Sequence, residues 1–585
     1  MRYMTIGFLF LSVVLAGHAQ DAGGWDTYSD TWAATDGLGR VVVEHDVTGG
    51  LRPEKTVGVF YYIWHGQHGT ALHDITKIRE ANPENPAWGP VGIFHHWGEP
   101  LYGYYIADDA YVIRKNAQML ADAGVDVIFF DVTNAFPYTS VYLKLCQIYT
   151  EIRAQGGRTP QIAFLTNSAS GQTVQSVYDN LYAKGLYKDL WFHWDGKPLI
   201  LAKTEEMTPE TLDFFTVRRS WAWDPGKDKW PWLERYPQKG GWHDSPEKIE
   251  QMVVETAEHP IGHNDGLGLG KSFRNNVQPK PGFYESEQGY YFAAQWEQAL
   301  KINPAFVFIT QWNEWIAQRF LAEADQVFAG QPIKKGDTFF VDVYSMEFNR
   351  DIEPMQGGYQ DNYYYQMVDG IRRFKGTRPL PPASAAQTIA LEDFQAWADV
   401  QPEYRDDRGD LSSRDHKGYG DLHFTNQGGL HDLLKAKIAR DAQNLYFYIE
   451  TVDALQPIEA TNWMRLFLSI EGREGPVWET WQYLVQPQRA AADSPLTLYC
   501  SEGGWQWQAL ADVDWAMEGN RMALRIPRSL LGLGGADPVA IRFKWADGMQ
   551  DPSPLDWILH GDTAPNGRFQ YRYRAEEASA VPPTP

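Results

Sequence analysis

The feature that most constrains the fold is an alternation that runs from residue 55 to residue 375. Short apolar runs rich in β-branched residues alternate there with longer segments that have the period of a helix. This alternation is typical of βα units, in which crossover helices join parallel strands. The candidate strands lie at residues 57–63, 125–131, 161–165, 198–202, 216–223, 240–243, 305–310 and 338–342. Eight such units predict a (β/α)8 TIM barrel of the α/β class.

Six segments between these runs are predicted to be helices. They lie at residues 110–123, 140–154, 174–184, 246–257, 290–302 and 361–374. In a barrel of this kind the active site forms where the carboxyl ends of the strands meet their loops. We therefore expect catalytic residues directly after the apolar runs.

A change of pattern near residue 376 predicts a second domain. Residues 376–388 contain three prolines and no apolar period, which is typical of an extended linker. Short alternating strands follow and predict an all-β sandwich; they lie at 433–438, 445–450, 464–470, 522–526 and 539–544. The 585 residues thus divide into a barrel domain at 20–375, the linker, a sandwich at 389–575 and a tail at 576–585.

The first 19 residues have the pattern of a secretory signal peptide. Arg2 is followed by an apolar run at 6–16 and by small residues that end at Ala19. This apolar run is shorter than the roughly 20 residues that a spanning helix needs. We expect a secreted or periplasmic protein without a membrane span.

Composition excludes several function classes. The formal charge of −23 argues against a nucleic-acid partner, because neutralising phosphates requires clustered Lys and Arg. There is no P-loop, dinucleotide fingerprint or Gly-x-Ser-x-Gly elbow, so we expect no cofactor and no serine esterase chemistry. The chain has 24 Trp, and aromatic rings stack well on the flat faces of sugars. A polysaccharide or oligosaccharide is therefore the expected partner.

The segment at 311–315, Gln-Trp-Asn-Glu-Trp, is the strongest candidate for chemistry. Glu314 follows a strongly apolar strand and lies between two indoles, which would raise its pKa toward that of a general acid. Asn313 is positioned to hold a sugar hydroxyl. The alternative is that Glu314 forms a structural salt bridge and that the tryptophans only pack.

Glycoside cleavage usually needs two carboxyl groups, one on each side of the bond. Asp131 ranks first as the partner of Glu314, because it also ends an apolar strand. Glu205 and Glu206 rank second. Asp342, Glu285, Glu287 and Asp244 follow at a lower rank.

Aromatic and His-rich stretches after the first strand are candidate substrate-binding surface. Together with residues around the two acids, the predicted contacts are Tyr62, Trp64, His65, His95, His96, Trp97, Tyr105, Asn134, Trp312, Asn313 and Trp315. Rings can stack on sugars and imidazoles can bond hydroxyls. His residues also ligate metals, but no His-Glu-x-x-His, Cys cluster or carboxylate spacing indicates a zinc or calcium site, so we expect no metal.

The barrel region resembles glycoside hydrolase families 71 and 99. The resemblance rests on Trp-Asn-Glu-Trp at 312–315, Tyr-Tyr-x-Trp at 61–64 and Phe-Asp-x-Thr-Asn at 130–134. It implies an exported (β/α)8 enzyme of the kind that acts on α-linked glucans and mannans. In family 99 a second catalytic Glu follows the first by three residues, and that position is Ala317 here. The resemblance therefore implies a catalytic role for Glu314 alone.

The C-terminal region resembles family 9-like carbohydrate-binding modules. The similar segment is residues 437–449, which leads to Asp453. It implies a β-sandwich that holds an enzyme near a polysaccharide.

The sequence thus predicts a secreted glycoside hydrolase with Glu314 and Asp131 as catalytic acids. Two alternatives stay open. One is a glycan-binding protein that has kept the barrel without catalysis, and the other is a metal-dependent enzyme that uses the His-rich loops.

Overall fold

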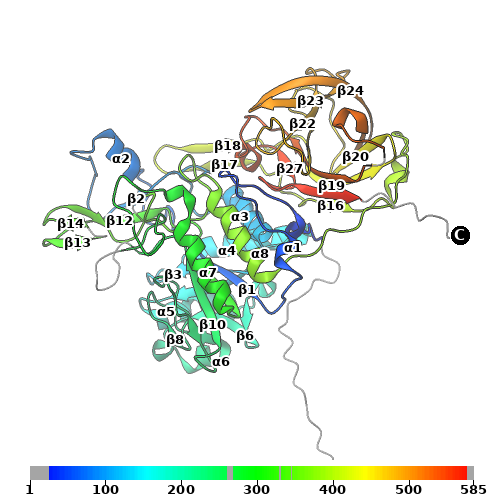
Figure 1. Cartoon of the computed structure of the whole chain (residues 1–585). Helices are drawn as coiled ribbons and strands as arrows, with labels where there is room; N and C mark the ends of the chain where they lie inside the picture. The colour runs from blue at the N-terminus through cyan, green and yellow to red at the C-terminus, as the bar shows by residue number, and fades with distance from the viewer. Residues whose placement is uncertain (1–24, 260–267, 329–330, 344, 536, 576–585) are drawn as a thin grey trace, which may run out of the picture.

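The computed structural model describes residues 25–259, 268–328, 331–343, 345–535 and 537–575. The predicted signal peptide and the predicted tail lie outside these residues. An α/β region and an all-β region lie side by side (Figure 1). Within the described part of the chain, no helix is both long and apolar enough to cross a membrane.

A curled, mostly parallel sheet forms the centre of the α/β region. Seven neighbouring strands run parallel, in the order β7 (Thr216–Arg218), β6 (Lys197–Leu201), β4 (Gln161–Thr166), β3 (Val127–Val132), β1 (Thr56–Tyr61), β11 (Phe306–Thr310) and β10 (Ile249–Glu255). The short strand β5 (His193–Trp194) pairs antiparallel with β6, and β9 (Gly241–Trp242) pairs antiparallel with β10. Strands β1, β3 and β11 are buried along their whole length, as expected for a parallel sheet covered on both faces.

The sheet does not form a regular eight-stranded ladder. The short strand β8 (Gly226–Lys227) pairs with β9, and only single bridges, such as Arg219 to Lys229, join the region of β8 to that of β7. The expectation of a TIM barrel is thus met only in part. The structure shows a curled sheet rich in parallel strands.

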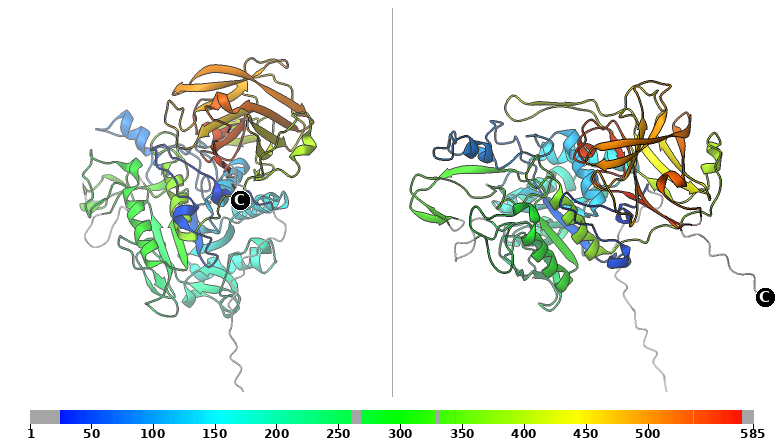
Figure 2. Two further views of the ribbon diagram at one scale, coloured as in Figure 1. Left: turned by 45° about the vertical axis from the view of Figure 1, so that its right-hand side comes forward. Right: turned by 45° about the horizontal axis from the view of Figure 1, so that its top comes forward.

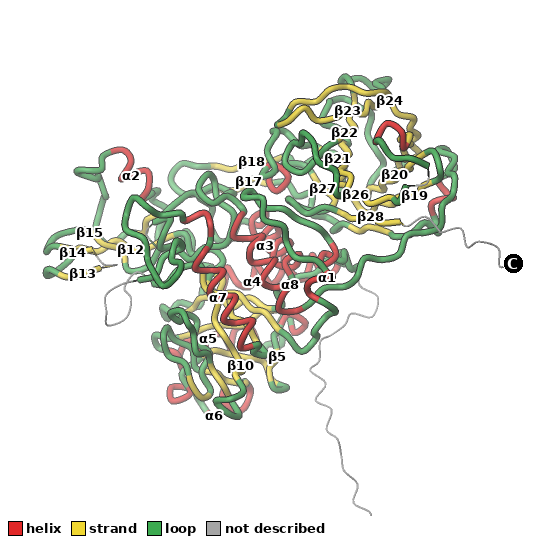
Figure 3. The backbone as a smooth tube through the Cα atoms, viewed as in Figure 1, coloured by secondary structure: helices red, strands yellow, loops and turns green. Residues whose placement is uncertain are grey.

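Helices cover this sheet (Figure 3). They are α3 (Ala110–Ala123), α4 (Thr139–Ala154), α5 (Ser170–Val177), α6 (Pro209–Phe214), α7 (Tyr290–Ile302) and α8 (Asn362–Lys375), with the shorter α1 (His45–Thr48) and α2 (Ile75–Ala81) outside them. Helix α3 begins where the Asp109 carboxylate accepts the Tyr111 N–H and ends at Gly124, whose φ of 84° suits glycine. The predictions for α3, α4, α7 and α8 are confirmed.

The helix predicted at 246–257 is wrong, because this segment contains strand β10. Its Ile249, Met252 and Val253 have helical spacing, but Val253 and Val254 are fully buried between neighbouring strands. Tertiary pairing has overridden a short local period.

An arm leaves the curled sheet between residues 316 and 340. Strand β12 (Ile316–Leu321) pairs with β2 (Phe94–His96) on one side and with β15 (Thr338–Phe340) on the other. Strands β13 (Gln326–Phe328) and β14 (Gln331–Ile333) extend the arm outward (Figure 1). The run at 338–342 is therefore not a strand of the curled sheet, as the sequence pattern suggested, but part of this arm.

The C-terminal region is an antiparallel β-sandwich, as predicted. Its strands are β16 (Glu403–Arg405), β19 (Leu433–Arg440), β20 (Asn444–Thr451), β21 (Arg465–Ile470), β22 (Tyr483–Pro487), β23 (Leu496–Gly503), β24 (Gln506–Glu518), β25 (Arg521–Pro527), β26 (Val539–Asp547), β27 (Asp562–Ala564) and β28 (Tyr571–Ala575). Helix α9 (Asp556–Leu559) precedes β27.

The two regions lie against each other (Figure 2), and ion pairs between side chains connect them. The hairpin β17 (Arg414–Lys417) and β18 (His423–Asn426) reaches back to the α/β region, where Arg414 forms a buried ion pair of 2.7 Å with Asp109. Arg568 pairs with Asp361 at 2.7 Å. These two buried ion pairs join the C-terminal region to the residues that precede α3 and α8.

Candidate active site

Three carboxyl groups meet at the carboxyl end of the curled sheet. Asp131 lies at the end of β3, and Glu314 lies in the loop after β11. Asp342 lies two residues after β15, where the chain returns from the arm. The charges of Asp342 and Asp131 act on Glu314, and the charge of Asp342 acts on Asp131, so the three groups are electrostatically linked.

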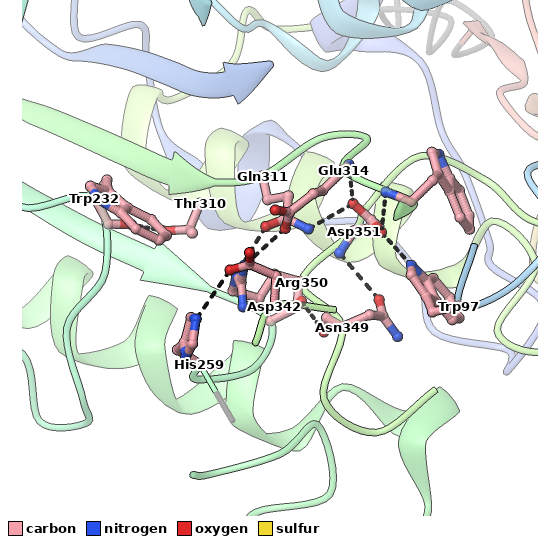
Figure 4. Close-up of polar contacts among 12 residues, drawn as sticks. Trp97, Trp232, His259, Thr310, Gln311, Glu314, Asp342, Asn349, Arg350 and Asp351 are labelled. Carbon is pink, nitrogen blue, oxygen red and sulfur yellow. Dashed lines mark hydrogen bonds and ion pairs between the residues drawn. The ribbon is translucent and has the colours of Figure 1, made fainter. Parts of the chain in front are cut away.

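The buried guanidinium of Arg350 holds two of these acids together. Its Nη2 lies 2.9 Å from Oε2 of Glu314 and 3.8 Å from Oδ1 of Asp342 (Figure 4). The Arg350 side chain has no exposed surface. Because one nitrogen reaches both acids, Glu314 and Asp342 are neighbours despite their separation in sequence.

The three acids differ in their access to solvent. Asp131 and Glu314 are only 4% and 3% exposed, whereas 39% of the Asp342 side chain is exposed. Asp342 also accepts a hydrogen bond of 3.1 Å from Nε2 of His259 if that nitrogen carries the proton. Asp342 is thus the acid of the three that an incoming molecule reaches most easily.

The pKa values of the three acids are shifted in different directions. Burial, together with the charges of Asp342 and Asp131, raises the pKa of Glu314 well above its ordinary value, although Arg350 opposes the shift. Burial raises the pKa of Asp131 to about 6. Burial would also raise the pKa of Asp342, but the hydrogen bond and charge of His259 and the charge of Arg350 together lower it. The directions of these shifts favour a proton on Glu314 over one on Asp342.

A fourth acid, Asp351, fixes the loop that carries Glu314. Its carboxylate accepts the backbone N–H groups of Glu314 and Trp315 at 2.5 and 3.2 Å. The Trp97 indole and the Gln311 amide donate to it at 2.6 and 2.9 Å. Gln311 and Trp315 have φ values of 82° and 45°, unfavourable for residues with a Cβ. Asp351 thus stabilises a loop whose backbone is strained.

A fifth acid, Glu353, anchors the other side of the same loop. It accepts hydrogen bonds from the Trp315 indole, the Tyr105 hydroxyl and the Asn116 amide. Burial raises its pKa to about 8. Asn313 is held in turn, because its amide bonds the backbone of Tyr62 and the hydroxyl of Tyr105. Asn313 therefore positions the loop with the same groups that we expected to bind a sugar.

Most of the predicted substrate contacts lie inside the protein. Trp97 and Trp315 stack on each other with centroids 5.0 Å apart, and neither they nor Trp312 have exposed surface. His95 contacts the carbonyls of Trp88 and Ile93, and the buried His96 packs edge-on against Tyr104 and Tyr419. These five side chains are buried and pack beneath the surface of the site.

Four other predicted contacts are also buried but lie closer to the acids. Burial and the charges of Glu314 and Asp131 raise the pKa of Tyr62. His65 contacts the Glu314 carbonyl at 3.1 Å. Trp64 stacks on His65, and Tyr105 is held by Glu353. Asn134, in contrast, is exposed in the loop after β3. Substrate contact by any of them stays a prediction.

The exposed rings near the acids come from other segments. On the Asp131 side Phe136 is exposed, and it packs with Tyr138 and His68. On the Arg350 side the exposed Trp221 meets Trp232, whose ring the Arg350 guanidinium approaches at 5.8 Å. Aromatic side chains thus flank the acids on two sides.

The sequence analysis missed Arg350, Asp351, Glu353 and His259, and it ranked Asp342 low. Arg350, Asp351 and Glu353 lie in a segment without strand or helix, where no periodic pattern marks them. One signal was present, since Asp342 directly follows an apolar run. The exposed Glu205 pairs with Arg219 at 3.2 Å on the surface instead.

The described residues bring no group of histidines together with metal-ligand spacing. In the sandwich, Trp463, Trp478, Trp481, Trp545 and Trp557 are buried, whereas Trp505 and Trp507 are half-buried. The resemblance to a carbohydrate-binding module stays a prediction.

Comparison with known proteins finds distant structural neighbours. No family model matches the chain, and no curated protein does. Among solved structures, the GH99 endo-α-mannosidase from Bacteroides thetaiotaomicron is similar in complex with Bis-Tris propane (15% identity, 55% of this chain and 97% of that chain, TM-score 0.30). A second structure of that enzyme gives 14% identity, 55% and 98% coverage and a TM-score of 0.30. The neighbours belong to a family that the sequence resembles, but at this TM-score the similarity assigns no activity to this chain.

Proposed function

We propose that this chain is a glycoside hydrolase in which Glu314 and Asp342 are the catalytic acids. One observation carries the proposal: a buried carboxyl group and a solvent-accessible carboxylate share the Arg350 guanidinium. Glycoside cleavage needs one group that donates a proton to the leaving oxygen and one that is ionised. In this site Glu314 would be the proton donor and Asp342 the ionised group at the same pH.

Each acid has the environment that its role requires. Glu314 keeps its proton because burial and the neighbouring negative charges raise its pKa, so it acts as the general acid. Asp342 is ionised and accessible, so it attacks the anomeric carbon or activates water. Asp131, the partner that sequence reasoning ranked first, becomes a third acid that modulates the charge of the pair.

The arm accounts for the absence of an acid at residue 317. Ala317 lies in β12, is 1% exposed and pairs in register with His95, so a carboxylate there would be buried inside a sheet. The chain returns along β15 and brings Asp342 to Glu314 instead. The second acid thus reaches the site by a different segment.

The substrate class follows from the rings around the acids. Phe136 and Trp221 expose flat apolar surface, the first packed on Tyr138 beside Asp131 and the second on Trp232 beside Arg350, and such surface suits the faces of sugar rings. We propose a polysaccharide or oligosaccharide substrate. The apolar N-terminal run supports secretion, where such substrates occur.

The test compares three variants on a panel of polysaccharides and aryl glycosides. We expect Glu314→Gln and Asp342→Asn each to lower kcat by about 10²–10⁴, the usual contribution of a positioned acid or base. The matched control is Glu205→Gln, since Glu205 is a surface carboxylate with a 58% exposed side chain. Its kcat should equal that of the wild type.

A binding measurement separates hydrolysis from glycan binding. If the wild type binds a glycan by titration but releases no reducing sugar from any substrate, the chain is a glycan-binding protein and the proposal fails. If Asp342→Asn retains full activity while Asp131→Asn loses it, the assignment of the second acid is wrong.

A further inference from the structure

A second cluster of carboxyl groups lies between the two regions of the molecule. Asp406 and Asp410 come from the loop after β16, and Asp562 begins β27. One oxygen from each lies within 4.8 Å of the others. Gly409, with φ of 77°, turns the loop so that Asp406 and Asp410 approach the same point.

The Asp406 carboxylate is buried without a partner. Asp406 has no exposed surface, and neither of its carboxylate oxygens has a hydrogen-bond partner among the described residues. Oδ1 of Asp410 is also buried and unpartnered there. A buried carboxylate with no compensating bond costs several kcal/mol. These oxygens therefore need a cation or a proton.

The surrounding charge is strongly negative. Asp407, Asp432 and Asp122 add to the field at the cluster, and the like charges raise the pKa of Asp406 and of Asp562 beyond the effect of burial. The cations that interact with the three acids are Lys115 and Lys544, while Arg158 acts on Asp122 and Asp407 and Arg408 acts on Asp432. Within the described part of the chain, neither lysine forms an ion pair with Asp406, Asp410 or Asp562.

We propose that Asp406, Asp410 and Asp562 bind a calcium ion at the junction between the sandwich and the α/β region. Calcium takes six to eight oxygen ligands at about 2.3–2.6 Å, so two oxygens on opposite sides of one ion lie about 5 Å apart. The observed spacing fits this limit. All three donors are carboxylate oxygens, whereas zinc and copper favour nitrogen and sulfur ligands.

The position of this site gives the ion a structural role. The amide of Gln118, on α3, donates to Asp410 at 2.5 Å, and Leu433 N–H in β19 donates to Asp562 at 2.6 Å. Helix α3 and two strands of the sandwich thus converge on the cluster. A calcium ion there strengthens the docking of the two regions, independently of the proposed hydrolase activity.

The test uses the full chain after treatment with a chelator. We expect dialysis against calcium to load one ion per chain at this site, and 1 mM CaCl2 to raise the unfolding temperature by about 2 °C or more. Asp406→Asn and Asp562→Asn should lose this shift and bind calcium at least about tenfold more weakly. Asp415→Asn is the matched control, because Asp415 lies in the same region with an 81% exposed side chain, and it should respond like the wild type.

Three results would overturn the proposal. The first is a wild-type unfolding temperature that calcium leaves unchanged. The second is a full calcium response in both Asp406→Asn and Asp562→Asn, which would place the ion elsewhere. The third is an equal shift from MgCl2 at the same concentration, which would contradict a site selective for calcium. If Asp406→Asn fails to fold, Asp562→Asn and the wild-type titration still decide the question.

Discussion

Two of the clusters of buried carboxyl groups among the described residues differ in how their negative charge is compensated. At the end of the curled sheet, Glu314 and Asp342 share the Arg350 guanidinium, and Asp342 is open to solvent. Between the two regions, the carboxylate of Asp406 has no hydrogen-bond partner among the described residues, and Asp406 has no exposed surface. A protein-borne cation leaves the acids free to exchange protons, whereas a bound metal ion would hold them ionised. The first arrangement suits catalysis and the second suits structural support.

The largest expected effect comes from removing the cation that distinguishes the first cluster. Arg350→Met removes the guanidinium from Glu314, Gln311 and Asp342, and each buried acceptor that is left unpaired costs about 1–3 kcal/mol of folding free energy. Urea unfolding measures this loss. The double variant Arg350→Met with Glu314→Gln should recover part of it, and strict additivity would contradict the shared-cation interpretation.

A smaller effect is expected at Asp351, which is satisfied by N–H donors rather than by a cation. Asp351→Asn puts an amide NH2 group against some of its donors, at a cost of about 1–3 kcal/mol. The Glu314 loop should also lose order, so kcat should fall with little change in KM. An unchanged kcat in a folded variant would show that Asp351 does not position Glu314.

The third prediction concerns pH and Asp131. Its pKa of about 6 in the folded protein lies above the value of about 3.9 for an unfolded chain. The contribution of Asp131 to stability is therefore most favourable below pH 4 and falls as the pH rises from 4 to 6, because the folded state holds a proton at Asp131 that the unfolded state has released.

Asp131→Asn removes this cost and keeps the oxygen that accepts the Thr133 N–H at 2.9 Å. We expect the variant to be about 1–3 kcal/mol more stable than the wild type at pH 7 and no more stable at pH 4. Denaturant unfolding at the two pH values checks this. An equal gain at both values would mean that the change acts through packing rather than charge.

The smallest effect is expected at the rim. Trp221 is 40% exposed, so Trp221→Ala should leave stability unchanged and raise KM by a factor that corresponds to about 1 kcal/mol of stacking. The control is Leu510→Ala, an equally exposed apolar residue in β24 of the sandwich. Unchanged KM and kcat would place Trp221 outside the substrate path.

Local patterns predicted most of the α/β elements. The helices α3, α4, α7 and α8 have long, strongly periodic sequences, and β1, β3, β4, β6 and β11 are short apolar runs between turns. The pattern failed at β10, where a helical spacing over a few residues is outweighed by pairing with β11. It also failed at β15, because an apolar run does not show which sheet it joins.

The site was predictable only where an acid follows an apolar run. Glu314, Asp131 and, at a lower rank, Asp342 were found in this way. Arg350 lies in irregular structure 36 residues after Glu314, and only the return of the arm brings the two together. The interdomain cluster joins residues 406, 410 and 562 from separate strands and loops, so no sequence spacing reveals it.

The position of Asp342, one of the two proposed catalytic acids, depends on the arm between residues 316 and 340. Its strands bond to β2 and to each other rather than to the curled sheet, so insertions and deletions within it leave the ladder of parallel strands intact. Such changes move Asp342 relative to Glu314. Changes in the length of this peripheral arm can thus alter the position of Asp342 relative to Glu314 during evolution, while selection for stability acts on the sheet.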